Sequence, residues 1–575
     1  MIAPAAALPV RLPVWRARLL LVALLVAFVV LAGRAFYLQG VNKDFLRQKG
    51  EARYSRVITL KANRGNILDR NGEPLAISTP VESVAASPRD VEITQEQLSR
   101  LAKLLNVPAA ELQRRLADDK RDFVYLKRQL PPELAERVLG LNIPGIFLQR
   151  EYRRFYPYGD QTAHLIGFTD VDDRGQEGVE LAFDARLSGV NGSRRVLKDR
   201  LGNIIEGVES IRAPQDGQPV TLSIDRNIQY LAYRELVAAV VQHRARAGAV
   251  VVLDARTGEV LALVNQPSYN PNRRSKDVPP AYMRNRAVTD VFEPGSTLKP
   301  FTAAMALEAD RVRPDTIIQT APGTLTIGPA TIRDVHSAGA ITVAQVIQKS
   351  SNVGSAKMAL MLPAEYMYDR FQKLGFGRPP GMGFPGEAAG RLRPAKLWRP
   401  IEQATMSYGH GISVSLLQLA RAYTVFANDG ELRELSLLRL DHPAPSHRVF
   451  SAATARAVRA MLELVVQAGG TAPRAQVVGY RVAGKTGTAH KLNANGTYAE
   501  DRYVASFVGM APASDPRLIV AVMIDEPGNG QYYGGQVAAP VFSRIMAGAL
   551  RMLSVPPDNP GANVFPDFPE IQEST

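Results

Sequence analysis

The sequence contains no cysteine and only 7 histidines, and these shortages narrow the chemistry that the chain can perform. Without cysteine, disulfides, thiolate catalysis and cysteine-bound metals or clusters are excluded. The histidines show no His-x-x-x-His spacing typical of a metal site, and no Gly-x-Ser-x-Gly segment indicates a histidine-dependent serine hydrolase. We therefore expect no metal and no other cofactor.

Long apolar runs are also scarce, and the one that stands out lies near the N-terminus. It extends without interruption from Leu19 to Gly33 and is flanked by Arg16, Arg18 and Arg34. With its apolar neighbours it is long enough to cross a bilayer if the arginines extend toward the headgroups. We predict a transmembrane anchor over residues 19–38 after a cytoplasmic tail of residues 1–18, and a cleaved signal peptide is the alternative.

Positive charge is in excess, because 69 lysines and arginines against 55 acidic residues give a formal net charge of +14. Such a chain attracts anionic lipid headgroups, anionic wall polymers or nucleic acid. No nucleic-acid-binding module is visible, so beside a membrane anchor we expect lipid and wall polymers and no nucleic acid. The 575 residues, 46% of them hydrophobic, are enough for two or more globular domains.

The chain after the anchor divides into two predicted domains and a tail. Residues 39–217 alternate strand-and-turn segments with short helices, the first of them capped by Thr94, and are expected to be non-catalytic. Residues 218–555 begin with a helix capped by Asp225. Predicted strands occur at both ends of this domain, over residues 248–253, 260–264, 480–488, 503–510 and 518–524. Helices between them indicate an α+β domain around an antiparallel sheet. Residues 556–575, rich in proline and acid, are expected to be disordered.

The segment Glu293-Pro-Gly-Ser-Thr-Leu-Lys-Pro300 is predicted to be a turn followed by a helix. Ser296 and Lys299 are three positions apart, so their side chains share a helix face and can approach each other. Ser296 would lie at the helix N-terminus, where unpaired N–H groups favour negative charge. This arrangement suits a nucleophile beside a base. Taken alone it is weak evidence, since a capping serine and a solvated lysine give the same pattern.

Two further motifs strengthen the interpretation. Ser350-Ser-Asn352 and Lys485-Thr-Gly-Thr488 follow in the chain. Ser-x-x-Lys, a Ser-x-Asn element and Lys-Thr-Gly, in this order, are typical of penicillin-binding proteins and class A β-lactamases. Each motif is short and remains a hypothesis, but three in order are a strong joint signal.

On these motifs the chain resembles class B penicillin-binding proteins, the monofunctional peptidoglycan DD-transpeptidases, and most of all their cell-division (septal) branch. The likeness covers nearly the whole chain after the anchor. It includes Arg64-Gly-Asn-Ile-Leu-Asp-Arg-Asn-Gly72, Arg154-Phe-Tyr-Pro157, Ala163-His-Leu-Ile-Gly-Phe168, Gly175-Gln-Glu-Gly-Val-Glu180, Trp398 and Ser407-Tyr-Gly-His-Gly-Ile-Ser413. No lipid box, C-terminal repeat module or glycosyltransferase domain is visible.

The resemblance implies an elongated, mixed α/β-strand pedestal of the dimerisation type over residues 39–217. It also implies a serine β-lactamase-like transpeptidase domain over residues 218–555, with an antiparallel sheet flanked by helices. The implied ligands are stem peptides ending in D-Ala-D-Ala, and β-lactams. The implied partners are a membrane glycan polymerase of the SEDS type and other division proteins. The implied location is the bacterial inner membrane, with the catalytic domain in the periplasm at the septum.

The family's chemistry assigns roles to the matching residues. Ser296 would attack the penultimate D-Ala carbonyl, with Lys299 as its base or, alternatively, as a charged group that orients it. Ser350 would relay a proton, and Asn352 would bond Lys299 or the substrate amide. The expected carboxylate-binding groups are Lys485, Thr486 and Thr488, beside an edge strand where Gly487 admits the substrate backbone. The backbone N–H groups of Ser296 and Thr488 would form the oxyanion hole. Tyr408, Tyr532 and Tyr533 either line the cleft or serve only as packing.

Several functions of the same machinery stay open. An elongation-type transpeptidase, a DD-carboxypeptidase or a β-lactamase would use the same residues. An inactive penicillin-binding scaffold would not need them intact, so Ser296, Lys299, Ser350, Asn352 and Lys485 argue against it. The acceptor amine and the oligomeric state are not predicted.

Overall fold

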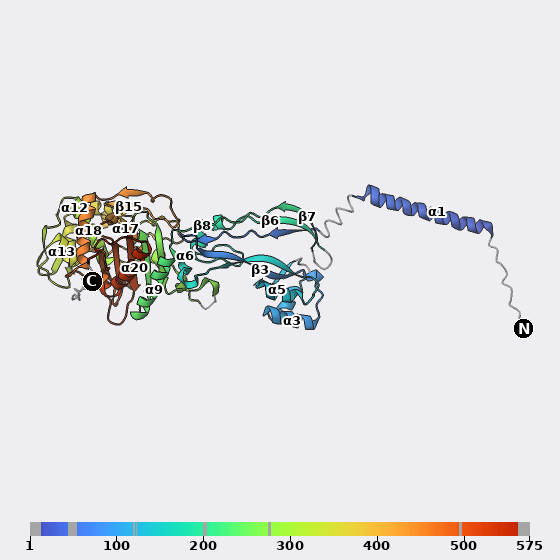
Figure 1. The fold of residues 1–575 in the computed structure, drawn as a ribbon, viewed down its shortest axis with the longest axis horizontal. Coiled ribbons are helices and arrows are strands. Elements are labelled where there is room, and N and C mark those ends of the chain that lie inside the picture. The colour runs from blue at the N-terminus through green and yellow to red at the C-terminus, as the bar shows by residue number, and fades with distance from the viewer. Residues whose placement is uncertain are drawn as a thin grey trace. The chain divides into compact units, whose positions relative to one another are not determined.

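A computed structural model of the full-length chain describes residues 13–43, 55–118, 121, 123–198, 204–273, 278–493 and 497–561. The chain forms two compact units, each assembled from separate segments (Figure 1). Unit 1 comprises Met1–Ala62, Pro80–Tyr152 and Val190–Gln215. Unit 2 comprises Asn63–Thr79, Arg153–Gly189 and Asp216–Thr575.

The apolar run near the N-terminus forms a long helix, α1 (Val14–Phe36), which continues as a π-helical turn through Val41. None of its residues is buried against the rest of the protein. Among the described residues, the 28-residue stretch Val14–Val41 is the only helix that is long and apolar enough to span a membrane. The helix starts before the predicted span of residues 19–38, because arginine is a good helix former and the flanking arginines therefore do not end it.

Besides α1, the described residues of unit 1 form a three-stranded sheet, part of a second sheet and three α-helices. In the first sheet, β1 (Ser55–Leu60), β6 (Gly192–Lys198) and β7 (Ile204–Arg212) pair antiparallel in that order. In the second, β3 (Pro74–Ala86) pairs with β4 (Val124–Leu130) and β5 (Ile146–Phe155). The helices are α3 (Gln95–Leu105), α4 (Ala109–Leu116) and α5 (Pro132–Leu139). The predicted cap at Thr94 is present, since its hydroxyl accepts from the Gln97 N–H at 3.2 Å.

Unit 2 is built on a five-stranded antiparallel sheet in the order β10-β9-β19-β18-β17. The strands are β9 (Ala247–Asp254), β10 (Val260–Gln266), β17 (Ala483–Leu492), β18 (Tyr498–Ala511) and β19 (Leu518–Asp525). All eight residues of β9 are buried, as expected when both faces of a sheet are covered. Two groups of helices contact the sheet, α9 with α20 and α17 with α18. The predicted α+β architecture is therefore confirmed, with β17 at one edge.

Unit 2 contains further helices and short strands besides this sheet, some of them labelled in Figure 1. The helices are α6 (Ala163–Ile166), α7 (Gly178–Ala182), α8 (Asp184–Leu187), α9 (Arg226–Gln242), α10 (Pro280–Met283), α11 (Arg286–Thr289), α12 (Lys299–Glu308), α13 (Val343–Gln348), α14 (Asn352–Leu360), α15 (Ala364–Lys373), α16 (Pro400–Met406), α17 (Leu416–Ala427), α18 (Ala452–Val466), α19 (Gly534–Val537) and α20 (Ala539–Met552). The short strands are β2 (Ile67–Leu68), β8 (Val220–Thr221), β11 (Ile317–Gln319), β12 (Thr324–Ile327), β13 (Ala330–Arg333), β14 (Ala340–Thr342), β15 (Glu431–Arg433) and β16 (Ser446–Arg448). Asp225 caps α9 as predicted, accepting from the Asn227 N–H at 2.9 Å.

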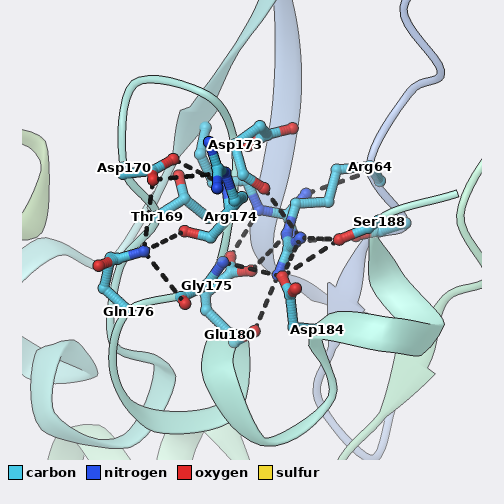
Figure 2. A network of polar contacts seen from close by, with 12 residues as sticks. Arg64, Thr169, Asp170, Asp173, Arg174, Gly175, Gln176, Glu180, Asp184 and Ser188 are labelled. Carbon is cyan, nitrogen blue, oxygen red and sulfur yellow. Dashed lines mark hydrogen bonds and ion pairs between the residues drawn. The ribbon is translucent and has the colours of Figure 1, made fainter. Parts of the chain in front are cut away.

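A buried ion network joins three of the sequence motifs that carry the family resemblance (Figure 2). The Glu180 carboxylate, 0% exposed, accepts from Arg64 Nε at 2.7 Å and from Arg154 Nε at 2.6 Å. Arg64 Nη1 also donates to Asp184 Oδ1 at 2.7 Å and to the carbonyl of Asp173 at 2.9 Å. Because buried charges are stable only when they are paired, these contacts fix the segments of unit 2 that precede its main sheet.

The units differ in outline from the predicted domains. The segments Asn63–Thr79 and Arg153–Gly189, placed in the pedestal by the prediction, belong to unit 2. The boundary at residue 217 itself stays a prediction. In the tail, residues 556–561 have a defined conformation, since Asp558 accepts from the Arg481 N–H at 2.7 Å and from Ser514 Oγ at 2.7 Å. This differs from the disorder expected there, and residues 562–575 lie outside the described residues.

Candidate active site

The predicted nucleophile lies on a 3-10 turn, η5 (Gly295–Leu298), which leads directly into α12. Gly295 has φ of +57°, a conformation that a residue without a Cβ adopts at little cost. Two hydrogen bonds hold the turn: Thr297 Oγ1 donates to the Pro294 carbonyl at 2.8 Å, and the buried Tyr423 hydroxyl donates to the Thr297 carbonyl at 2.8 Å. Ser296 is therefore rigidly placed, and its side chain is only 2% exposed.

Lys299 is the first residue of α12 and is completely buried. Its Nζ donates to Ser350 Oγ at 3.1 Å and to the Ser350 carbonyl at 2.5 Å. The structure thus brings the first and second motifs into direct contact. A direct bond between Ser296 and Lys299 stays a prediction.

Ser350 lies between the two lysines of the site. Its Oγ accepts from Lys299 Nζ at 3.1 Å and from Lys485 Nζ at 2.9 Å. Its backbone φ of +59° is a left-handed conformation that is uncommon for a residue with a Cβ, and residues in such conformations concentrate at functional sites. Ser350 is not a helix cap, since that position belongs to Ser351, which accepts from the Gly354 N–H at 2.9 Å.

Asn352 is the first residue of α14, and of its side-chain amide only the nitrogen makes a hydrogen bond among the described residues. Nδ2 donates to the Arg333 carbonyl at 3.1 Å. Oδ1 is buried and has no hydrogen-bond partner in the part of the chain that the structure describes. A bond from Lys299 would have to reach this oxygen, because a lysine only donates. The expected bond to Lys299 is therefore not formed here, which leaves a substrate amide as the predicted partner.

Asp334 was not predicted, although it anchors the second motif. One carboxylate oxygen accepts from the N–H groups of Asn352 at 2.6 Å and Val353 at 3.0 Å, and the other accepts from Ser351 Oγ at 2.6 Å. These bonds satisfy unpaired donors at the N-terminus of α14. No local signal marks this residue, because it lies on a loop outside the motif that it holds.

Lys485 lies on β17, which is an edge strand as predicted. It is fully buried, and its Nζ donates to Ser350 Oγ at 2.9 Å and to Thr486 Oγ1 at 3.1 Å. Gly487 allows the strand to approach the nucleophile turn, because a Cβ there would lie 2.8 Å from the Pro294 carbonyl oxygen. The missing side chain is thus required by close packing, a reason additional to the predicted access for a substrate backbone.

The two threonine hydroxyls of the third motif already have partners. Thr486 Oγ1 lies 2.7 Å from Thr471 Oγ1, a residue that the sequence did not single out. Thr488 Oγ1 accepts from the Gly534 N–H at 3.0 Å. These contacts join β17 to the segment before η7 (Pro473–Ala475) and to the start of α19. The predicted carboxylate-binding hydroxyls are therefore held in fixed positions.

The three predicted tyrosines fall into two aromatic groups. Tyr532 and Tyr533 have ring centroids 4.6 Å apart, and Tyr532 stacks on Tyr503 at 4.2 Å. Tyr503, which the sequence analysis missed, lies on β18 opposite His490 of β17, with rings 4.5 Å apart. Tyr408 belongs to the second group and contacts His410 at 5.2 Å. The structure thus brings Tyr532 and Tyr533 together and groups Tyr408 with other residues.

Burial shifts the pKa values of two groups around the nucleophile turn, His410 and Glu293. The pKa of His410 is lowered to about 4 by burial and, to a smaller extent, by the positive charges of Lys299 and His490. Burial raises the pKa of Glu293, while bonds from the Gly411 N–H at 2.8 Å and the Tyr498 hydroxyl at 2.9 Å oppose that rise. His410 is therefore neutral near pH 7.

Comparison with known proteins identifies the family. The penicillin-binding protein transpeptidase domain matches residues 248–547, and the penicillin-binding protein dimerisation domain matches residues 59–222. A probable peptidoglycan D,D-transpeptidase, PenA of Neisseria gonorrhoeae, is 47% identical over 549 residues, covering 95% of this chain and 94% of the relative. The peptidoglycan D,D-transpeptidase FtsI of Escherichia coli K12 is 44% identical over 550 residues, covering 95% of this chain and 93% of FtsI.

Solved structures of similar proteins support the same family. Penicillin-binding protein 3 of Mycobacterium tuberculosis, solved with aztreonam, has a TM-score of 0.68 at 29% identity and covers 89% of this chain and 100% of that one. The transpeptidase domain of Burkholderia pseudomallei penicillin-binding protein 3 has a TM-score of 0.54 at 52% identity, covering 59% of this chain and 97% of that one. With two family domains in order and relatives matched over nearly their full length, this chain belongs to the class B penicillin-binding proteins, the peptidoglycan D,D-transpeptidases.

Proposed function

We propose that this chain cross-links peptidoglycan stem peptides at the division septum through an acyl-enzyme on Ser296. The observation that carries the proposal is the buried Ser350 hydroxyl, which accepts from both Lys299 and Lys485 beside a buried Ser296. A serine with a lysine as its base needs such a dry, pre-organised arrangement. The intact set also argues against an inactive scaffold.

In the first half-reaction, Ser296 Oγ attacks the carbonyl of the penultimate D-Ala. Lys299 takes the hydroxyl proton if it is neutral at that moment, a role that complete burial favours, because burial disfavours the charged form of a lysine. The C–N bond to the terminal D-Ala breaks, and Ser350 passes the proton to the leaving nitrogen. The chain of contacts from Lys299 through Ser350 to Lys485 supports this path.

In the second half-reaction, an amine of a neighbouring stem attacks the acyl-enzyme and forms the cross-link. The same groups run in reverse: Ser350 accepts the proton from the attacking amine, and Lys299 returns a proton to Ser296 as it leaves. Ser296 and Thr488 supply backbone N–H groups for the oxyanion. The close approach of their segments supports this pairing, since a Cβ on Gly295 would lie 3.2 Å from the Thr488 carbonyl oxygen.

Substrate recognition is assigned to the edge of β17. The peptide backbone would add to this edge as a further strand. Lys485, Thr486 and Thr488 would bind the terminal carboxylate, and the free Oδ1 of Asn352 would accept from a substrate amide N–H. Tyr503 of β18 stacks on Tyr532, whose ring contacts Tyr533, and this aromatic row is assigned to the cleft wall.

Helix α1 is assigned as a retained single-pass anchor in the inner membrane. Its length, composition and full exposure fit a bilayer environment. The chain after this anchor would then lie in the periplasm, where the stem peptides are. We propose a SEDS-type glycan polymerase and other division proteins as partners, as the family resemblance implies.

The deciding experiment incubates the detergent-solubilised full-length protein with a fluorescent penicillin. Wild type and the exposed-serine control Ser446→Ala should each give a stable covalent band. Ser296→Ala should give none while its circular dichroism spectrum stays unchanged. A band of wild-type strength on Ser296→Ala would remove this residue from the mechanism.

Product analysis separates the proposal from its rivals. Wild-type protein given stem peptides ending in D-Ala-D-Ala should release D-Ala and form a cross-linked dimer. Release of D-Ala with free tetrapeptide as the only product would indicate a DD-carboxypeptidase. Rapid loss of the fluorescent band with hydrolysed drug would indicate a β-lactamase.

A further inference from the structure

Thr471 is a buried hydroxyl that none of the motifs contains. It lies in the short segment between α18 and η7, and it is only 2% exposed. Its Oγ1 is 2.7 Å from Thr486 Oγ1, and either atom can be the donor. Its carbonyl oxygen would lie 2.3 Å from a Cβ on Gly535, so its backbone is also packed tightly against α19. Thr471 is therefore held against two of the elements that line the proposed carboxylate site.

The Thr486 hydroxyl has a single proton, which either Thr471 or a ligand carboxylate could accept. A hydroxyl offers one proton and two lone pairs. Lys485 Nζ donates to Thr486 Oγ1 at 3.1 Å and occupies one lone pair. If Thr486 gives its proton to Thr471, no proton is left for a ligand. If Thr471 is the donor, the Thr486 proton is free to bond a carboxylate oxygen.

We propose that Thr471 is a positioning residue that directs the Thr486 hydroxyl toward the substrate and so makes the site selective for a free C-terminal carboxylate. The inference rests on the proposed function, in which Thr486 binds that group. When the carboxylate enters, Thr471 becomes the donor and Thr486 turns its proton to the ligand. Both threonines then keep every bond they need, which matters because unpaired polar atoms are costly in a buried site.

Donation from Thr471 to Thr486 also strengthens the hydrogen bond that Thr486 donates to the carboxylate. Consecutive hydrogen bonds polarise one another, so an oxygen that accepts from two donors gives a better O–H donor. Thr486 Oγ1 would accept from Lys485 and from Thr471 and donate to the carboxylate. The chain of contacts that runs from Lys299 through Ser350 and Lys485 to Thr486 thus ends at Thr471.

The test compares two acyl donors that differ only at their C-terminus, one with a free carboxylate and one with a primary amide. The second-order acylation rate of Ser296 is measured on the full-length protein. Thr471→Val keeps the shape and removes the hydroxyl, so the carboxylate substrate should lose about three- to tenfold, the value of one neutral hydrogen bond. The amide substrate should lose less than about twofold, and Thr471→Ser should retain the wild-type rates within about twofold, since it keeps the hydroxyl.

Two outcomes would overturn the inference. Equal losses with both substrates would make Thr471 a purely structural residue, and no loss with either would make its hydroxyl irrelevant. If Thr471→Val does not fold, judged by thermal unfolding, Thr471→Ala gives the same comparison. Thr486→Val is measured alongside: a carboxylate-specific loss there with an unaffected Thr471→Val refutes only this inference. An equal loss with both substrates in Thr486→Val refutes the proposed carboxylate site itself.

Discussion

Among the single residues of the site, Ser350 has an unfavourable backbone conformation, and its hydroxyl lies between the two buried lysines. Its φ of +59° is a region where a residue with a Cβ is less stable than glycine by roughly 1 kcal/mol. The conformation places its Oγ between Lys299 and Lys485. The left-handed backbone of Ser350 therefore lowers the stability of the fold but positions Oγ between the two lysines, as is common at catalytic sites.

Two variants of Ser350 separate the effect of its backbone conformation from the effect of its hydroxyl. Ser350→Gly and Ser350→Ala both lack the hydroxyl, so each should slow acylation by at least about 100-fold, the usual worth of a positioned proton-transfer group. Ser350→Gly should nevertheless be more stable than Ser350→Ala by roughly 1 kcal/mol, because glycine adopts the left-handed conformation without strain. Chemical denaturation measures the stability and fluorescent penicillin the acylation. Equal stability of the two variants would show that the backbone carries no strain.

Among helices and strands, α14 depends on a carboxylate outside its own sequence. Asp334 accepts from two N–H groups and one hydroxyl at the N-terminus of α14, where the second motif lies. A helix start that is held this firmly keeps Ser350 and Asn352 in register with the nucleophile turn.

Asp334→Asn should weaken this hold while preserving the shape of the side chain. We expect a loss of about 1 kcal/mol in unfolding free energy, typical of an impaired cap, and a larger proportional loss in acylation rate because Asn352 shifts. Thermal unfolding and acylation kinetics are compared in the same preparation, with Asp315→Asn, an exposed aspartate, as the control. An unchanged acylation rate with reduced stability would limit Asp334 to a purely structural role.

The ion network of unit 2 gives the fold a dependence on pH (Figure 2). The pKa of Asp173 is raised to about 6, chiefly by burial, against the opposing effects of Arg64 and Arg154. The folded protein therefore binds this proton more tightly than the unfolded chain, whose aspartate pKa is about 3.9. The resulting stabilisation is complete below about pH 4 and is lost as the pH rises through 6.

Asp173→Asn should remove that dependence, because an amide does not titrate. Between pH 4 and 7 the wild type should lose roughly 2–3 kcal/mol of stability that the variant does not lose. Urea unfolding at a series of pH values measures both. Parallel curves for the two proteins would show that Asp173 is ionised in the folded state throughout this range.

The sequence predicted those features whose residues lie close together along the chain. Ser296 with Lys299, and Ser350 with Asn352, stand within single short motifs, and the caps at Thr94 and Asp225 act on the residues directly after them. Strands β9, β10 and β19 of the main sheet follow from largely apolar runs.

Asp334, Thr471 and Tyr503 could not be predicted in this way. Asp334 and Thr471 contact the motifs through the tertiary fold, from loop segments that carry no pattern of their own. Tyr503 lies in a predicted strand, but its contacts with His490 and Tyr532 also arise only from the tertiary fold. The predicted domain bounds stay a prediction, and the compact units are discontinuous, because unit 2 takes segments from before and after parts of unit 1 along the chain.

At the scale of the whole molecule, α1 contributes no buried residue to a folded core. Deleting residues 1–41 should therefore move the protein from the membrane fraction to the soluble fraction without changing its acylation by fluorescent penicillin. Fractionation by ultracentrifugation and gel fluorescence measure the two properties. Persistent membrane association of the deleted protein would reveal a second membrane-binding surface, and a lost signal would make α1 necessary for the active fold.

The strand order β10-β9-β19-β18-β17 means that the earliest strand of the sheet, β9, pairs with the last, β19. Ser296 precedes the strand that carries Lys485, and that strand is held by neighbours made later still. A chain interrupted in synthesis between residues 296 and 525, where β19 ends, has the nucleophile but not the complete sheet around it. Nascent polypeptides should accordingly escape covalent capture by antibiotics, and a labelled-penicillin count in cells should register finished molecules alone.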